Sequence, residues 1–79
     1  MRYYIIVFKN TLEAMNGEKV LKEEGFNFRM MPTPTVITQS CGICVRIEDE
    51  NYIDEIIKRN IIKYKGIYIK EDNIFKEVI

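Results

Sequence analysis

The feature that most restricts the fold is the unbroken run of β-forming residues at positions 3–8, Tyr-Tyr-Ile-Ile-Val-Phe. Successive side chains of a strand point to opposite faces, so a run that is apolar at every position suits a central strand covered on at least part of both faces. The run is far shorter than the ~20 apolar residues that a bilayer requires, and it lacks the layout of a secretory signal. We therefore expect a cytoplasmic protein built around this strand.

The rest of the chain alternates between helical and extended patterns. Asn10 and Glu13 fit a helix N-terminal cap with a reciprocating acid, and Gly25 suits the left-handed position after a helix end. Gly17 falls inside that helix, which indicates close packing of its backbone against the sheet. Apolar spacing predicts helices over 11–24 and 49–60 and strands over 26–30, 42–47 and 66–69, while 74–79 suits either a short helix or an added strand.

This element order predicts an α+β fold with one domain over residues 1–79. The order β-α-β-β-α-β is that of a ferredoxin-like two-layer sandwich, with two helices on one face of a four-stranded antiparallel sheet. Arg29, Cys44 and Arg46 are expected on the other face, which would lie open. A chain this short buries only roughly 60% of its unfolded surface. We therefore expect the open face to be closed by a second copy in a homodimer.

Charge and residue usage exclude several classes of function. The chain has 12 acidic and 12 basic residues and a formal net charge of zero, so no nucleic-acid partner is expected. It has no histidine, which removes catalysis by Ser-His-Asp or Cys-His groups and metal motifs that contain histidine. Neither a cofactor nor a membrane partner is expected. In a reducing cytoplasm the two cysteines should be free thiols.

The candidate functional site is a loop in which prolines precede the cysteines. Pro32-Thr33-Pro34 leads through Ser40 into Cys41-Gly42-Ile43-Cys44, where a strand is expected to begin. Thiolates attack electrophiles, so Cys41 at a loop-to-strand junction is the candidate nucleophile, and we expect its sulfur to be exposed. Gly42 would let successive backbone N–H groups face an anion, as in a backbone nest. The alternative is that Cys41 packs as a small apolar residue.

Other interpretations of the cysteines stay open. In an extended strand, residues three apart lie about 10 Å apart, so a redox dithiol of Cys41 and Cys44 would need a bend at Gly42. One Cys-x-x-Cys segment supplies half of a zinc site, which a dimer could complete. Arg29 and Arg46 are candidates to lower the pKa of a thiolate or to hold an anionic substrate, although solvated strand residues would look the same.

The chain resembles the small bacterial family described as putative selenium/sulfur carrier protein-like. The resemblance covers residues 4–69 and is most specific where Pro32-x-Pro34 leads into Ser40-Cys41-Gly42-Ile43. It implies that Cys41 is the acceptor of sulfur or selenium, as a persulfide or selenosulfide. Two positions differ from the family's pattern: Thr35 where a basic residue is common, and Cys44 where a small apolar residue is common.

Two functions follow as hypotheses. In the first, Cys41 receives sulfur or selenium from a donor protein and passes it to an acceptor protein, both of unknown identity. In the second, the protein is a non-catalytic binding or assembly module in which Cys41 is packed. A dithiol redox protein and a zinc-bridged dimer are further alternatives. The two main hypotheses describe a carrier or a binding module rather than a stand-alone enzyme.

Overall fold

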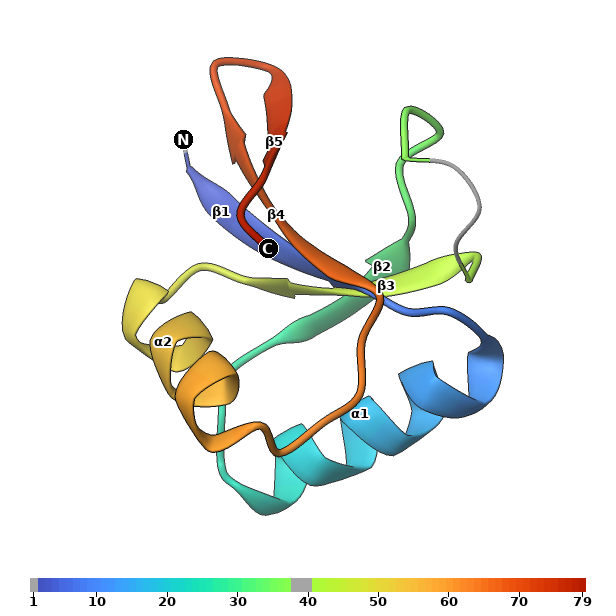
Figure 1. Ribbon diagram of the computed structural model, residues 1–79, viewed down its shortest axis with the longest axis vertical. Helices are drawn as coiled ribbons and strands as arrows, with labels where there is room; N and C mark the ends of the chain where they lie inside the picture. The colour runs from blue at the N-terminus through green and yellow to red at the C-terminus, as the bar shows by residue number, and fades with distance from the viewer. Residues whose placement is uncertain (1, 38–40) are drawn as a thin grey trace.

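A computed structural model describes residues 2–37 and 41–79. Its elements are β1 (Tyr3–Val7), α1 (Thr11–Glu23), β2 (Arg29–Pro32), β3 (Ile43–Ile47), α2 (Glu50–Arg59), β4 (Gly66–Glu71) and β5 (Ile74–Glu77). The strands form one antiparallel sheet in the order β2-β3-β1-β4-β5, and both helices lie on the same side of it (Figure 1). The predicted α+β class is confirmed. In the described ranges, neither helix has the length and apolar character needed to cross a bilayer.

The sheet has five strands, so the prediction of a four-stranded ferredoxin-like sheet was wrong in strand number. The tail forms β5, which pairs with β4 from Glu71 opposite Ile74 onward. Asp72 and Asn73 connect the two strands with φ angles of 53° and 65°. Positive φ at both turn residues matches the twist of a two-residue hairpin, and aspartate and asparagine tolerate this conformation better than most residues.

Strand β2 begins later than predicted and includes Pro32. The prediction placed a strand over 26–30 and an irregular start to the segment after it, whereas β2 covers Arg29–Pro32. Because the Thr33 N–H donates to the Gly42 carbonyl of the neighbouring segment, the nitrogen of Pro32 faces away from the sheet. A proline is tolerated there because β2 is an edge strand. Phe26 instead stacks on Tyr52 of α2, with ring centroids 4.8 Å apart.

Helix α1 follows the local signals in the sequence. The Asn10 side chain accepts a hydrogen bond of 2.8 Å from the Glu13 N–H, which confirms the predicted cap. Gly25 has a φ of 77°, in the left-handed region. Gly17 packs against the fully buried ring of Phe8, since a Cβ atom at this position would lie 2.8 Å from that ring. The close backbone packing predicted at Gly17 is confirmed.

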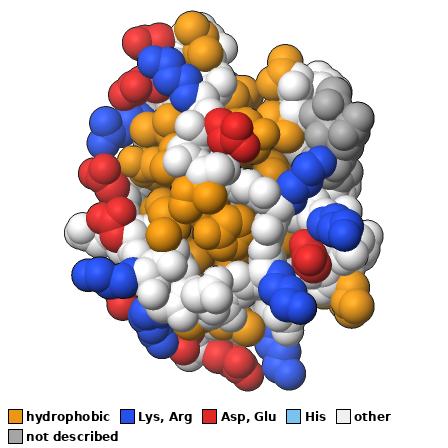
Figure 2. Space-filling view, in the orientation of Figure 1, with side chains coloured by type: hydrophobic (Ala, Val, Ile, Leu, Met, Phe, Trp, Pro, Cys, Tyr) orange, Lys and Arg blue, Asp and Glu red, His pale blue; other side chains and the backbone are white. Residues whose placement is uncertain are grey.

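Each side of the sheet has its own buried cluster. The helix face is the side covered by α1 and α2, and its cluster includes Tyr4, Ile6 and Phe8. We call the opposite side the far face; its buried residues are Tyr3, Ile5, Val7 and Cys44. In the view of Figure 2, hydrophobic side chains gather in the middle and charged ones are spread around the outline.

The far face is not open, contrary to the prediction. The β4–β5 hairpin and the segment after β2 rise on the side opposite to the helices (Figure 1). Their side chains pack over β1, so that Ile5 is 0% exposed. The covering residues are Met31, Ile37, Tyr68 and Phe75. A strand that is apolar at every position is thus buried on both faces within one chain, and the far face needs no second copy to cover β1.

Candidate functional site

The prolines and the cysteines predicted to form a site lie side by side. Strands β2 and β3 pair with Pro32 opposite Ile43 and Met31 opposite Cys44. Beyond the last pair, Thr33 continues the contact: its N–H donates to the Gly42 carbonyl at 3.0 Å, and its hydroxyl donates to the Cys41 carbonyl at 2.7 Å. The segment from Pro32 to Pro34 is therefore tied to the start of β3. Ser40 lies outside the described residues.

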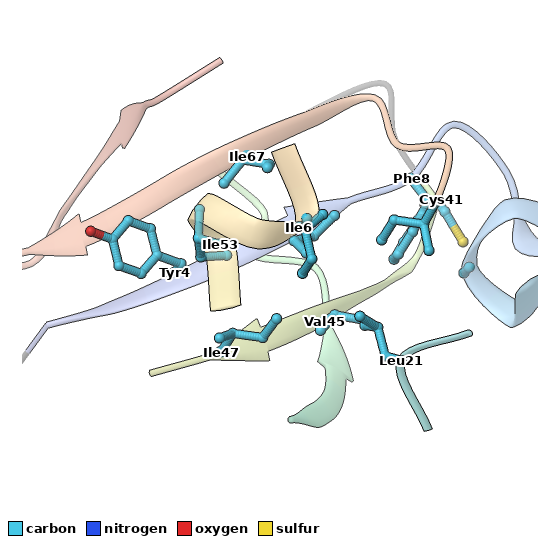
Figure 3. Packing of buried hydrophobic residues seen from close by; sticks show 12 residues of the cluster. Tyr4, Ile6, Phe8, Leu21, Cys41, Val45, Ile47, Ile53 and Ile67 are labelled. Carbon is cyan, nitrogen blue, oxygen red and sulfur yellow. The ribbon is translucent and has the colours of Figure 1, made fainter. Parts of the chain in front are cut away.

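Cys41 belongs to the helix-face cluster. Its N–H donates to the Phe8 carbonyl at 2.7 Å, and the residue is only 8% exposed. Figure 3 shows its sulfur directed away from the other labelled side chains and toward the blue helix α1. The expectation of an exposed thiol was wrong, because Cys41 points to the same side as Val45, where α1 and α2 cover the sheet.

The predicted backbone nest around the cysteine is not formed by the Cys41 amide. That N–H already donates to Phe8 and is not available to an anion. A Cβ atom on Gly42 would meet nothing within 4 Å, and Gly42 does not have a left-handed φ. Neither a close approach nor an unusual backbone angle thus requires glycine at this position.

The Cys41 sulfur lies beside the start of α1 and not beside the backbone nest that we expected. The Cys41 sulfur lies 3.8 Å from the hydroxyl oxygen of Thr11, the first residue of the helix. The N-terminus of a helix carries partial positive charge from its aligned peptide dipoles, which favours negative charge nearby. Sequence reasoning missed Thr11 and Thr33. The available signals were a hydroxyl residue directly after the Asn10 cap, and the single N–H donor between two prolines.

Cys44 has a different environment. It lies on the far face, is 0% exposed, and its thiol donates to the Pro32 carbonyl at 3.8 Å. Burial raises the pKa of the Cys44 thiol from 9.0 to about 11; the nearby Thr33 side chain opposes this rise and the charge of Cys41 adds to it. Cys44 is therefore protonated at neutral pH and is a poor nucleophile.

The two sulfurs lie on opposite faces of the sheet. Both cysteines are free thiols. In this arrangement they form neither a dithiol pair nor half of a zinc site. Among residues 2–37 and 41–79, no group of three or more cysteine, aspartate or glutamate residues could hold a metal ion.

Arg29 and Arg46 accompany Cys44 rather than Cys41. They are direct partners across β2 and β3. The guanidinium carbon of Arg46 lies 3.9 Å from the centre of the Tyr3 ring, and a terminal nitrogen lies 3.7 Å from Glu48. Because Tyr3 and Cys44 belong to the far face, neither arginine flanks the Cys41 sulfur. Their predicted role in activating that thiol is therefore not supported.

The chain is similar to a known protein family. A family model described as "Putative Se/S carrier protein-like" matches residues 3–69. No curated protein and no solved structure matches the chain. The matched range includes β1 to β3 with both cysteines and ends inside β4, so β5 lies beyond it.

Proposed function

We propose that this chain, which belongs to the putative Se/S carrier protein-like family, carries a sulfur or selenium atom on Cys41. The observation that carries the proposal is the position of the Cys41 sulfur, 3.8 Å from the Thr11 hydroxyl at the first residue of α1. The partial positive charge at a helix start attracts anions, and the transfer step proceeds through an anionic sulfur. The proposal concerns a carrier, not a stand-alone enzyme.

The transfer is an exchange that needs no oxidant. The Cys41 thiolate attacks the outer sulfur of a donor persulfide, so that a new S–S bond forms and the donor leaves as a thiolate. The terminal S–H proton stays on the transferred sulfur or exchanges with water. A thiolate of the acceptor then attacks the same outer sulfur and returns Cys41 to its thiolate form. The equivalent exchange with selenium would give a selenosulfide.

Transfer requires a local opening at Cys41, since only 8% of this residue is exposed. The Thr33 hydroxyl bond to the Cys41 carbonyl and the Cys41 amide bond to Phe8 would have to loosen. A small number of hydrogen bonds allows such an opening without global unfolding. A donor or acceptor protein that docks beside α1 could stabilise the open form.

Cys44 has no chemical role in this proposal. Its raised pKa keeps it protonated, and its sulfur lies on the other face from Cys41. We propose a reducing, cytoplasmic setting, in which both thiols stay free, with donor and acceptor proteins as the partners.

One observation favours a second candidate, a binding or assembly module. Cys41 is a member of the buried helix-face cluster, which is also what a purely structural cysteine would show. In that case the thiol fills space between β3 and α1, and the protein acts through its surface.

The deciding experiment is incubation of the folded protein with a persulfide donor, followed by intact-mass measurement. We expect wild type and Cys44→Ala to gain one sulfur atom and Cys41→Ser to gain none. The same incubation in urea is the control for intrinsic reactivity. An adduct that forms only in urea would favour the packed module, and an equal adduct on Cys41→Ser would remove the carrier proposal.

A further inference from the structure

A second feature lies apart from the Cys41 environment, in a cleft at the edge of the sheet. Its volume is about 280 Å³, and its lining includes Asn27, Arg29, Arg46, Glu48, Asp49 and Tyr52. The residues come from β2 and the segment before it, from β3, and from the start of α2. This cleft plays no part in the proposed transfer at Cys41.

The two arginines of the cleft are placed against each other, and only Arg46 has an ion-pair partner in the described part of the chain, Glu48 at 3.7 Å. Arg29 and Arg46 are direct partners in an antiparallel pair, where Cβ atoms are about 4.5–5.5 Å apart and like charges are destabilising. Within residues 2–37 and 41–79, the Arg29 side chain has no ion-pair or hydrogen-bond partner. Its guanidinium is therefore available to a ligand.

Arg46 is held in place by an aromatic ring, but one of its hydrogen-bond donors has no partner in the described part of the chain. Its guanidinium lies over the Tyr3 ring, with 3.9 Å from the guanidinium carbon to the ring centre. Its Nε is buried and has no hydrogen-bond partner in the described part of the chain. Buried polar groups in folded proteins nearly always have a partner, so this unpaired donor calls for an explanation, and an acceptor from outside the chain is one that the cleft allows.

The acidic residues of the cleft do not supply that acceptor. The Asp49 carboxylate caps α2 by accepting the Asn51 N–H at 2.9 Å. Glu48 approaches only a terminal nitrogen of Arg46, at 3.7 Å, and its side chain is 55% exposed. An exposed contact at this distance is weak and can be displaced. One of the two guanidinium groups thus remains without a negative partner.

We infer that this cleft binds a small oxyanion between Arg29 and Arg46. A guanidinium presents N–H groups in a fork that matches two oxygens of one anion, and two facing forks can hold one ligand from two sides. Asn27 and Tyr52 also line the cleft, and their side chains are of types that can donate neutral hydrogen bonds. The inference is independent of the proposed transfer, because the cleft does not include Cys41.

The test is thermal unfolding and calorimetric titration with sodium sulfate, phosphate and acetate, at ionic strength held constant with chloride. We expect sulfate or phosphate to raise the melting temperature of wild type. Acetate distinguishes a site for any oxyanion, if it acts equally, from a site for tetrahedral anions. Absence of binding by all three probes at millimolar concentration would overturn the inference.

Two cleft variants and one control localise the effect. We expect Arg29→Gln and Arg46→Gln each to weaken binding at least about tenfold, since each removes charge-assisted hydrogen bonds. Arg46→Gln also removes the contact with the Tyr3 ring and could unfold the protein. In that case Arg29→Gln alone still tests the cleft. Lys19→Gln, an exposed charge on α1, is matched in charge and should bind as wild type does. Equal binding by Arg29→Gln and wild type would contradict the assignment.

Discussion

Cys41 and Cys44 flank the same dipeptide, Gly42-Ile43, yet the sheet places them in different chemical environments. Both residues are buried, with 8% and 0% exposure, so burial does not separate them. The residues around each sulfur differ. The Cys41 sulfur lies at the start of a helix, beside a hydroxyl, whereas the Cys44 sulfur lies among apolar side chains and has a raised pKa.

The environment of each thiol depends on the side of the sheet on which it lies. The helix face offers a cysteine the positive end of α1, because the helix begins next to the strand end. The far face, which is closed by the two edges of the sheet, buries Cys44 among mainly apolar side chains, and this burial raises the pKa of its thiol.

The largest expected effect tests whether the far face is as closed as the helix face. Ile5 and Ile6 are both 0% exposed and lie on opposite faces of β1. Either change to alanine should lower the free energy of unfolding by about 2–5 kcal/mol, because each leaves a cavity. Urea denaturation followed by circular dichroism measures both. If Ile5→Ala cost less than about 1 kcal/mol, the far face would be open in solution.

The next effect is a loss of stability at alkaline pH that depends on Cys44. Its thiol keeps its proton up to about pH 11 in the folded state, whereas in the unfolded chain it loses the proton near pH 9.0. The unfolded state therefore binds fewer protons between these values, and stability falls as pH rises through this window, by up to about 2 kcal/mol. Denaturant unfolding of wild type and Cys44→Ala across this range isolates the effect, since lysines and tyrosines titrate in both. Parallel pH profiles would contradict it.

The reactivity of the two thiols should differ in the folded protein. At pH 8, a pKa of about 11 leaves roughly one Cys44 in a thousand as thiolate. We expect iodoacetamide to label Cys41 at least about tenfold faster than Cys44. Mass spectrometry on Cys41→Ala and Cys44→Ala, each with a single cysteine, gives the two rates separately. Equal rates would mean that the contrast between the faces does not reach the chemistry.

The Thr33 hydroxyl holds the backbone of Cys41 in place. Removing this hydroxyl should therefore loosen Cys41. Thr33→Val removes the 2.7 Å bond to the Cys41 carbonyl and keeps the shape of the side chain. We expect a loss of about 1 kcal/mol in stability and faster labelling of Cys41. Unchanged labelling together with lower stability would show that this bond does not limit access to the sulfur.

The smallest effect is expected at Gly42. A Cβ atom has open space there, and the backbone angles do not require glycine. Gly42→Ala should change the free energy of unfolding by less than about 0.5 kcal/mol and leave sulfur loading of Cys41 unchanged. A large loss of loading without a loss of stability would restore a functional role for the glycine backbone.

Local patterns predicted much of the fold. The cap at Asn10, the left-handed Gly25 and the tight packing of Gly17 depend on neighbours that are close in sequence or on backbone geometry, and all three were predicted. The position of β2 was not predicted, because the alternating Phe26 and Phe28 resemble a strand, while Phe26 packs on α2. The effect of Pro32 depends on which strand lies at the edge, which is a property of the whole sheet.

The site was predicted only in part for the same reason. The pattern of β3 placed Cys44 and Arg46 on one face and Val45 on the other, as the structure has them. The burial of Cys41 and its contact with Thr11 involve residues far apart in the sequence. No spacing rule indicates such a contact, since it exists only after α1 has packed against the sheet.

The outward nitrogen of Pro32 has a consequence for how the protein behaves when many copies are present. A strand from another molecule that approached this border would find no amide hydrogen at that point, and polymerisation strand by strand would be discouraged there. Pro32, which precedes the loop that leads to the cysteines, thus also protects the exposed edge of β2. The residues around the Cys41 sulfur can open locally for a partner protein, while the edge of β2 still disfavours the addition of a strand from another copy.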